Sequence, residues 1–172
     1  MDELRLKYDD SNAIYFISNF LSTYLNPNSI FLCIGTDKFI SDSLGPIVGD
    51  LLSKTIPSNY FVYGTLKSPI HAMNLEENIK YIKKRHLDSK IVAIDACLGD
   101  KESVGKISIK KAPLYPGKGV GKMLPPVGDI SIVGIVDVYN SIPLNSVRLG
   151  FVFELAEVIA KSIQLALKHK QS

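Results

Sequence analysis

Two aspartates that follow apolar runs of strand length are the residues best placed to do chemistry in this sequence. Residues 30–34 are continuously apolar and end at Gly35, and a polar loop then leads to Asp42. Residues 91–94 form a second apolar run that leads directly into Asp95. The carboxyl ends of neighbouring parallel strands meet at one edge of a sheet, so we expect Asp42 and Asp95 to converge there if these strands are neighbours.

The two carboxyl groups are expected to differ in acidity. Asp42 precedes a predicted helix, whose free N–H groups and positive dipole end favour a charged carboxylate. Asp95 comes straight from a buried strand, where loss of water raises the pKa of a carboxyl group. A pair with separated pKa values can supply a general base and a general acid. Spacing alone leaves two simpler interpretations open: a helix N-cap for Asp42, and a loop carboxylate that accepts local N–H groups for Asp95.

The elements that must position these residues are indicated by apolar periodicity. Helices are predicted at residues 11–25, from about residue 45, at residues 74–86, and from an Asn145 cap through Leu167; strands are predicted at residues 30–34, 60–63, 91–94, 104–109 and 130–136. The alternation of strands and helices predicts an α/β fold, a three-layer sandwich in which helices flank a mostly parallel (mixed) sheet.

The composition bounds the class of protein. A chain of 172 residues with 46% hydrophobic and 22% charged residues suits a single domain over residues 1–172. The net charge of +3 is far from that of a dedicated nucleic-acid binder, so no direct nucleic-acid partner is predicted. Two cysteines, an acidic N-terminus without a signal-peptide pattern and no membrane-length apolar run predict a cytoplasmic protein that does not bind membranes.

A histidine and a cysteine lie close in sequence to the predicted site. His71 precedes a helix and is a candidate third metal ligand beside Asp42 and Asp95, or a loop histidine with structural hydrogen bonds. Cys97 is a candidate nucleophile with His71 as its base, or a buried thiol, since no cysteine-protease signature surrounds it.

The segment 117–122 is rich in glycine and lysine. It lacks the strand, helix and Gly-Lys-Ser/Thr ending of a phosphate-binding P-loop. We interpret Lys118 and Lys122 as part of a basic loop that attracts an acidic peptide, with a solvated connecting loop as the alternative. The predicted substrate-binding residues are, in full, Asp37, Ser43, His71, Cys97, Lys118 and Lys122.

The motifs around both aspartates resemble those of a known superfamily. Asp-Ser-Leu-Gly-Pro at residues 42–46 resembles the D-[AS]-L-G-P element of the spore germination protease, and Ile94-Asp95-Ala96 resembles its I-D-A element. The sequence is more similar still to the YyaC-type (DUF1256) sporulation proteins, a shorter branch of that superfamily. Four stretches carry this resemblance: residues 34–49, 68–76, 93–99 and 116–136.

The resemblance implies the phosphorylase/hydrolase-like fold that germination proteases share with hydrogenase-maturation endopeptidases and purine nucleoside phosphorylases. It also implies an endopeptidase of spore-forming bacteria, in the forespore or mother cell, with Asp42 and Asp95 as its catalytic residues and no cofactor or required metal. Small acid-soluble spore proteins or other sporulation proteins are the implied substrates, and self-association into a homo-oligomer is implied as well. The alternatives are a metal-dependent endopeptidase, as in hydrogenase maturation where acidic residues and a histidine hold nickel, and a non-catalytic peptide-binding sporulation protein.

Overall fold

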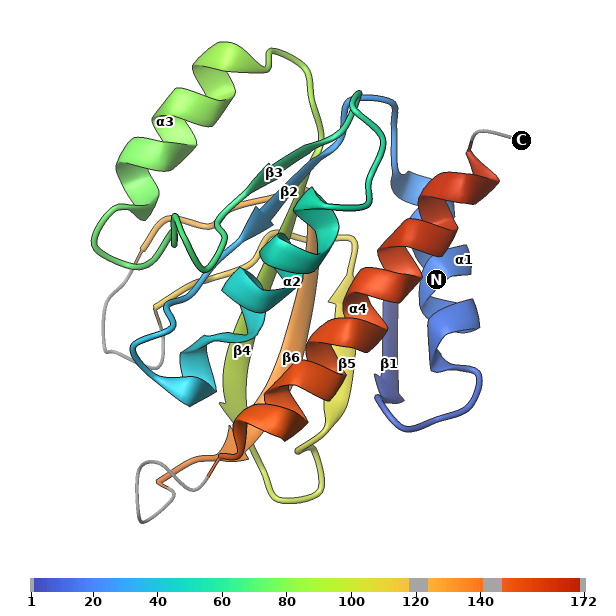
Figure 1. The fold of residues 1–172 in the computed structure, drawn as a ribbon, viewed down its shortest axis with the longest axis vertical. Coiled ribbons are helices and arrows are strands. Elements are labelled where there is room, and N and C mark those ends of the chain that lie inside the picture. The colour runs from blue at the N-terminus through green and yellow to red at the C-terminus, as the bar shows by residue number, and fades with distance from the viewer. Residues whose placement is uncertain (1, 118–123, 141–146, 171–172) are drawn as a thin grey trace.

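The computed structural model describes residues 2–117, 124–140 and 147–170. Within these ranges the chain forms six strands, four α-helices and one short 3₁₀ helix (Figure 1). In chain order they are β1 (Glu3–Lys7), α1 (Ala13–Tyr24), β2 (Ile30–Cys33), η1 (Ile40–Asp42), α2 (Leu44–Ser53), β3 (Phe61–Tyr63), α3 (Leu75–Arg85), β4 (Ile91–Gly99), β5 (Lys106–Lys110), β6 (Ile130–Val138) and α4 (Leu149–His169).

One mixed sheet holds all six strands, in the order β1-β5-β6-β4-β2-β3. β2, β3, β4 and β6 are parallel to one another, whereas β5 pairs antiparallel with both β6 and β1. Every residue of β2 is buried, as expected for a parallel strand that is covered on both faces. The predicted α/β fold with a mostly parallel, mixed sheet is therefore confirmed.

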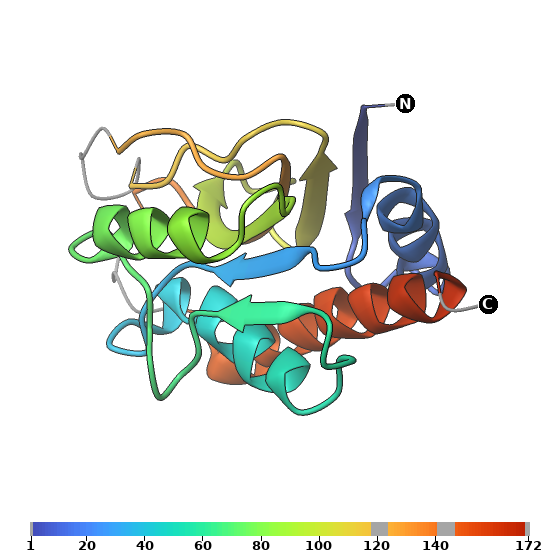
Figure 2. The same ribbon diagram turned by 90° about the horizontal axis from the view of Figure 1, so that it is seen from above.

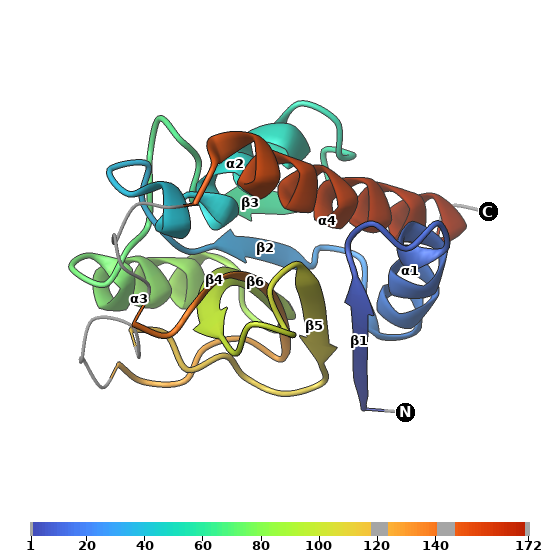
Figure 3. The same cartoon turned by 90° about the horizontal axis from the view of Figure 1, so that it is seen from below.

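Helices cover the sheet on both faces, which makes three layers (Figures 2 and 3). On one face, α1, α2 and α4 contribute residues such as Leu21, Leu52 and Ile159 to a core that includes Val92 and Ile132 of the sheet. On the other face, α3 and the chain between β5 and β6 form a smaller core, with Leu75, Ile82 and Leu114 among its residues. No helix in the described ranges is both long and apolar enough to cross a bilayer.

The helices form where their sequences favour them. An apolar stripe of α4 faces the sheet: Val152, Leu155, Ile159, Ile163 and Leu167 are at most 1% exposed. Leu149, which has the spacing expected for the same stripe, is 54% exposed at the first position of the helix. α3 has Glu76 and Glu77 in its first turn and three basic residues in its last turn, and both ends complement the helix dipole. The Asn145 cap predicted for the last helix lies outside the described residues, and α4 begins at Leu149.

Two strands differ from the sequence-based prediction. The predicted elements did not include β1, which pairs along its whole length with β5. β4 was expected to end at Asp95, but it continues to Gly99 because β6 remains paired with it up to Val138. Asp95 therefore lies within a strand, and its backbone is held by β6 on one side.

α2 begins in direct contact with the backbone at the end of β2. A Cβ atom added at Gly45 would lie 2.0 Å from the carbonyl oxygen of Ile34. Real Cβ contacts are essentially never this close, so only glycine allows the first turn of α2 to approach the sheet to this distance. This contact fixes where the residues that precede α2, including Asp42, lie relative to β2.

We expect Gly45→Ala to destabilise the protein by about 1–3 kcal/mol or more, because neither the helix nor the strand backbone can move away cheaply. Gly150→Ala is a matched control, since Gly150 is also in the first turn of a helix and a Cβ atom added there would meet nothing within 4 Å. The control should unfold at the wild-type temperature or slightly above it, because alanine is the better helix former. Equal thermal unfolding midpoints for both variants would contradict this account of the contact.

Candidate functional site

β2 ends before its neighbour β4, so the later residues of β4 have no β2 partner. The last pair between the two strands is Cys33 with Ile94, and the Ile34 N–H donates to the Ile94 carbonyl oxygen at 2.7 Å. Asp95 is therefore the first β4 residue beyond the paired part of β2. On the other side of the β2 end, the Gly35 N–H donates to the carbonyl oxygen of Ile70 at 2.7 Å.

The loop after β2 folds back over this edge and delivers Asp42. The Thr36 N–H donates to the backbone carbonyl of Asp42 at 2.9 Å, which closes the loop onto itself. Gly35 has a φ of +138°, and a Cβ atom there would lie 2.1 Å from the Asp42 carbonyl oxygen. The loop can take this path only with glycine at its base.

Asp95 is 9% exposed and accepts a hydrogen bond from its neighbour, since the Ala96 N–H donates to Asp95 Oδ1 at 2.8 Å. Burial raises its pKa well above the usual range, and repulsion from the Asp42 carboxylate raises the pKa further. The hydrogen bond from Ala96 opposes the rise but does not cancel it. The 3₁₀ helix η1, which ends at Asp42, contacts β4, so the two carboxyl groups lie near each other at this edge of the sheet, as the sequence predicted.

Asp42 is less enclosed, and its pKa rises to about 6 because of burial, against a hydrogen bond from the Thr36 backbone that lowers it. The expectation that a helix N-terminus would favour its charged form was wrong. Ser43, not Asp42, is the N-cap residue of α2, and no side chain caps that helix. Loss of water raises the pKa of Asp42 by more than the backbone hydrogen bond lowers it. Asp42 is still the more acidic member of the pair.

The other predicted site residues lie in different environments. Asp37 is exposed in the loop after β2. Ser43 is 3% exposed, and its hydroxyl donates to the Ile40 carbonyl at 2.7 Å, which gives it a local structural contact. Lys118 and Lys122 lie outside the described residues.

His71 lies just after the Ile70 segment that borders the end of β2. Its Nδ1 accepts a hydrogen bond from the Met73 N–H at 3.3 Å, and its own backbone N–H donates to Asn74 Oδ1 at 2.8 Å. Within the described ranges, no three His, Cys, Asp or Glu side chains gather closely enough to hold a metal ion. The alternative in which His71 joins Asp42 and Asp95 as a metal ligand therefore has no matching cluster in the described residues.

Cys97 is half-buried on β4, two residues after Asp95. Burial and the nearby Asp95 carboxyl raise the pKa of its thiol to about 11, against a lowering effect of the Arg5 guanidinium. A thiol of this kind stays protonated near neutral pH and is poorly suited to nucleophilic attack.

Sequence reasoning missed Arg5 as a residue near the site. Arg5 on β1 is opposite Ser108, Ser108 is opposite Val133, and Val133 is opposite Asp95, so the four residues form one row across the sheet. The signal was present in the alternation of polar and apolar residues from Glu3 to Lys7, which is typical of a half-buried strand.

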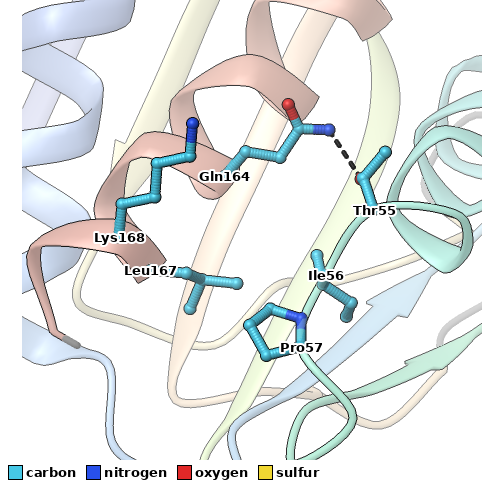
Figure 4. Close-up of a pocket in the computed structure, with 6 residues that line it drawn as sticks. All are labelled: Thr55, Ile56, Pro57, Gln164, Leu167 and Lys168. Atoms are coloured by element: carbon cyan, nitrogen blue, oxygen red, sulfur yellow. Dashed lines mark hydrogen bonds between the residues drawn. The ribbon is translucent and has the colours of Figure 1, made fainter.

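Two open pockets lie away from the aspartates, at the end of the sheet where β3 begins. The first, about 350 Å³ in volume, is formed by the α2–β3 turn and the last turns of α4 (Figure 4), and Gln164 Nε2 donates to Thr55 Oγ1 at 2.7 Å across it. The second, about 340 Å³, runs along β3 and shares Ile56 and Pro57 with the first. Neither pocket is lined by a group of acidic, basic or nucleophilic side chains suited to catalysis. The aspartate pair therefore remains the candidate site.

Comparisons with known proteins show the family and the fold of the chain. The family described as "Protein of unknown function (DUF1256)" matches residues 5–162. The "Uncharacterized protein YyaC" of Bacillus subtilis (strain 168) is 40% identical over 167 residues, which covers 93% of this chain and 82% of that protein. The crystal structure of the [NiFe] hydrogenase maturation protease HycI from Thermococcus kodakarensis KOD1 matches with a TM-score of 0.57 at 20% identity, over 87% of this chain and 99% of that one. This likeness shows that the chain has the fold of that protease.

The raised pKa values make a prediction about stability. Since both carboxyl groups hold their protons more tightly in the folded state, stability is lost as pH rises from about 4, the unfolded pKa of aspartate, through the folded values. We expect Asp95→Asn to unfold at a higher temperature than wild type at about pH 7.5, by about 2–4 °C for each kcal/mol recovered. The difference should vanish near pH 4, where the wild-type carboxyl groups are protonated.

Asp100→Asn is the control for this prediction. Asp100 is exposed, and its pKa is lowered by hydrogen bonds from Ser103 and by nearby cations, so its substitution should not raise the unfolding temperature. Calorimetry across this pH range compares the two variants. A lower unfolding temperature for Asp95→Asn than for wild type at neutral pH would contradict the inferred cost of ionising the buried carboxyl group.

Proposed function

The chain belongs to the DUF1256 family, and from this premise we propose that it is a peptidase in which Asp42 and Asp95 act as a general base and a general acid. The observation that carries the proposal is the pair itself: two largely buried carboxyl groups with raised pKa values, within electrostatic reach at one edge of a protease-like sheet. Perturbed carboxyl pairs of this kind are typical of acid–base catalysis.

The order of ionisation assigns the roles. Above about pH 6 the Asp42 carboxyl is charged, while burial and the Asp42 charge keep Asp95 protonated. Asp42 accepts a proton from a water molecule while the water oxygen forms a bond to the peptide carbonyl carbon. Asp95 donates its proton to the leaving nitrogen as the C–N bond breaks, so the products are a carboxylic acid and an amine.

The substrate in this proposal is a protein or peptide. The resemblance to germination proteases makes small acid-soluble spore proteins, and other proteins of the sporulating cell, the first substrates to test. The proposal assigns no step to a metal ion.

Cleavage of a panel of spore and denatured proteins tests the proposal. We expect wild type to cleave, and Asp42→Asn and Asp95→Asn each to lose at least about 100-fold in rate, the usual contribution of one general acid or base. Asp100→Asn removes an exposed carboxylate just beyond the end of β4, the strand that carries Asp95, and should retain activity. Activity abolished by a chelator would favour a metal-dependent endopeptidase, and no cleavage by folded wild type would favour a peptide-binding module.

The pH dependence of kcat/KM gives a second test. We expect the rate to rise as pH increases through about 6, where Asp42 becomes a base, and to fall at higher pH where Asp95 loses its proton. The two limits belong to the coupled pair, because each charge affects the other. A rate that keeps increasing with pH, without the upper limit, would contradict the assignment of Asp95 as the acid.

A further inference from the structure

A row of four side chains leads from Asp95 across the sheet to an arginine on the edge strand. Asp95 on β4 is opposite Val133 on β6. Ser108 on β5 is opposite both Val133 and Arg5, so it connects β6 to β1. Side chains that are opposite each other on paired strands point to the same face of a sheet. We refer to these four residues as the Arg5 row.

The residues next to Arg5 identify the face on which the row lies. Leu4 and Leu6 pack against the larger core, which α1, α2 and α4 cover. Because side chains alternate between the two faces of a strand, Arg5 points to the opposite face. Val133 packs against the smaller core on that face. There α3 covers one end of the sheet, and no helix of the described chain lies over β5 and β1 (Figures 2 and 3).

Solvent reaches most of the row. Val133 and Ser108 are half-buried, and Arg5 is exposed. Cys97, two residues after Asp95 and on the same face, is half-buried as well. A ligand that contacts the candidate site therefore has a partly open surface along which it can extend from β4 to β1.

The positive charge of Arg5 acts on this surface. The guanidinium lowers the pKa of the Asp100 carboxyl and opposes the rise in the pKa of the Cys97 thiol. Asp100 itself accepts hydrogen bonds from Ser103. Within the described residues, Arg5 takes part in no ion pair, since the ion pairs there join other side chains. Its N–H donors are therefore available to a ligand.

The charges around Arg5 favour an anion on the same face. Lys7 and Lys106 are directly opposite each other, and Lys7 shares the face of Arg5. Like charges in this position destabilise a strand pair, and an anion bound beside them removes that cost. The nearby carboxylate of Glu3 is already in an ion pair with Lys110 at 3.1 Å.

We propose that Arg5 binds a carboxylate of the peptide substrate, several residues away from the bond that Asp42 and Asp95 cleave. This inference rests on the proposed peptidase function and assigns a specificity residue to it. The planar guanidinium can donate two parallel hydrogen bonds to one carboxylate, a geometry that an ammonium group lacks.

The sheet geometry sets where the recognised carboxylate lies in the substrate. Three strand spacings of about 4.8 Å separate Arg5 from Asp95, which gives roughly 14 Å between their Cα atoms. An extended peptide advances about 3.3 Å per residue. Allowing for the lengths of the two side chains, we expect the carboxylate about two to five residues from the cleaved bond.

The protonation states of the proposed mechanism are compatible with an acidic substrate. Asp95 is protonated in the cleaving state and does not repel a carboxylate. Asp42 is charged, but its loop follows β2, which lies on the opposite side of β4 from Arg5. A carboxylate bound at Arg5 is therefore held away from the Asp42 charge.

Peptide binding to Asp95→Asn tests the role of Arg5 separately from catalysis. This background keeps the charge of Asp42, and asparagine is neutral like the protonated Asp95. Peptides of equal length share one centre and carry a single glutamate about two to five residues to either side of it, with glutamine in the matched peptides. Fluorescence anisotropy measures the affinities. We expect glutamate at one of these positions to bind at least about tenfold more tightly than glutamine.

Substitutions of Arg5 in the same background test which group recognises the carboxylate. Arg5→Gln should abolish the preference for glutamate, and Arg5→Lys should retain part of it, since lysine keeps the charge without the planar group. Arg5→Glu should prefer lysine to glutamate at the same position, a reversal that loss of folding cannot produce. The matched control is Arg85→Gln, because Arg85 is also exposed but ends α3, which leads to the amino end of β4. The control should keep the preference within about twofold.

The carboxylate can belong to an acidic side chain or to the C-terminus of the substrate. Glutamine peptides that end at the preferred position, with a free or an amidated C-terminus, distinguish these sources. Tighter binding of the free acid that Arg5→Gln removes would support Arg5 as the binding residue and identify the C-terminus as its ligand. A preference limited to internal glutamate would support Arg5 equally and identify a side chain.

The remaining outcomes separate this inference from the peptidase itself. Equal affinity for glutamate and glutamine peptides at every position, or equal loss of the preference in Arg5→Gln and Arg85→Gln, would overturn the role of Arg5 even if wild type cleaves proteins. A glutamate preference that depends on Arg5, with no cleavage by wild type, would keep the carboxylate site and reject the peptidase. In an active enzyme, Arg5→Gln should lower kcat/KM for the glutamate peptide and leave that for the glutamine peptide unchanged.

Discussion

At the carboxyl end of β2, two stretches of backbone touch with no side chain between them. Gly45 at the start of α2 approaches the Ile34 carbonyl, and Gly35 approaches the Asp42 carbonyl, at distances where a Cβ atom would collide with backbone. The loop between these contacts has little freedom, so the position of Asp42 is set by the packing of α2 on the sheet. The candidate site is therefore built into the layers of the fold and does not depend on a loop free to move.

Burying two carboxyl groups at this edge costs folding free energy, because each loses water that would solvate its charge. The other buried polar groups of the described chain avoid this cost. Every described buried side-chain polar atom has a hydrogen-bond partner. Asp95 has its partner too, yet one backbone N–H does not replace the water that a charged carboxylate loses. No cation is among the causes that shift the pKa of either aspartate. A structural role would be met better by asparagine, whereas proton transfer requires a carboxyl group.

The sequence predicted the parallel strands, the helices and the convergence of the aspartates, because long apolar runs and helical periodicity are local signals. It did not predict that β4 continues past Asp95, since that extension depends on pairing with β6, a strand that comes much later in the chain. β1 is a short edge strand, and its alternation extends over only five residues. The environment of Asp42 was mispredicted because desolvation by the folded layers exceeds the effect of the adjacent helix, a tertiary effect that spacing does not reveal.

The asymmetry of the pair follows from where each aspartate lies in the topology. Asp95 is on a central strand that pairs with β6 and contacts η1, and its 9% exposure leaves water little access to its carboxyl group. Asp42 is at the end of a surface turn and retains part of its hydration. As pH rises, Asp42 therefore ionises first, and its charge then delays the ionisation of Asp95. Burial makes the pKa values of the two aspartates differ, and mutual repulsion widens that difference. A state with one proton on the pair therefore persists over a range of pH above about 6. That singly protonated state is the one in which one carboxyl group can accept a proton while its neighbour donates one.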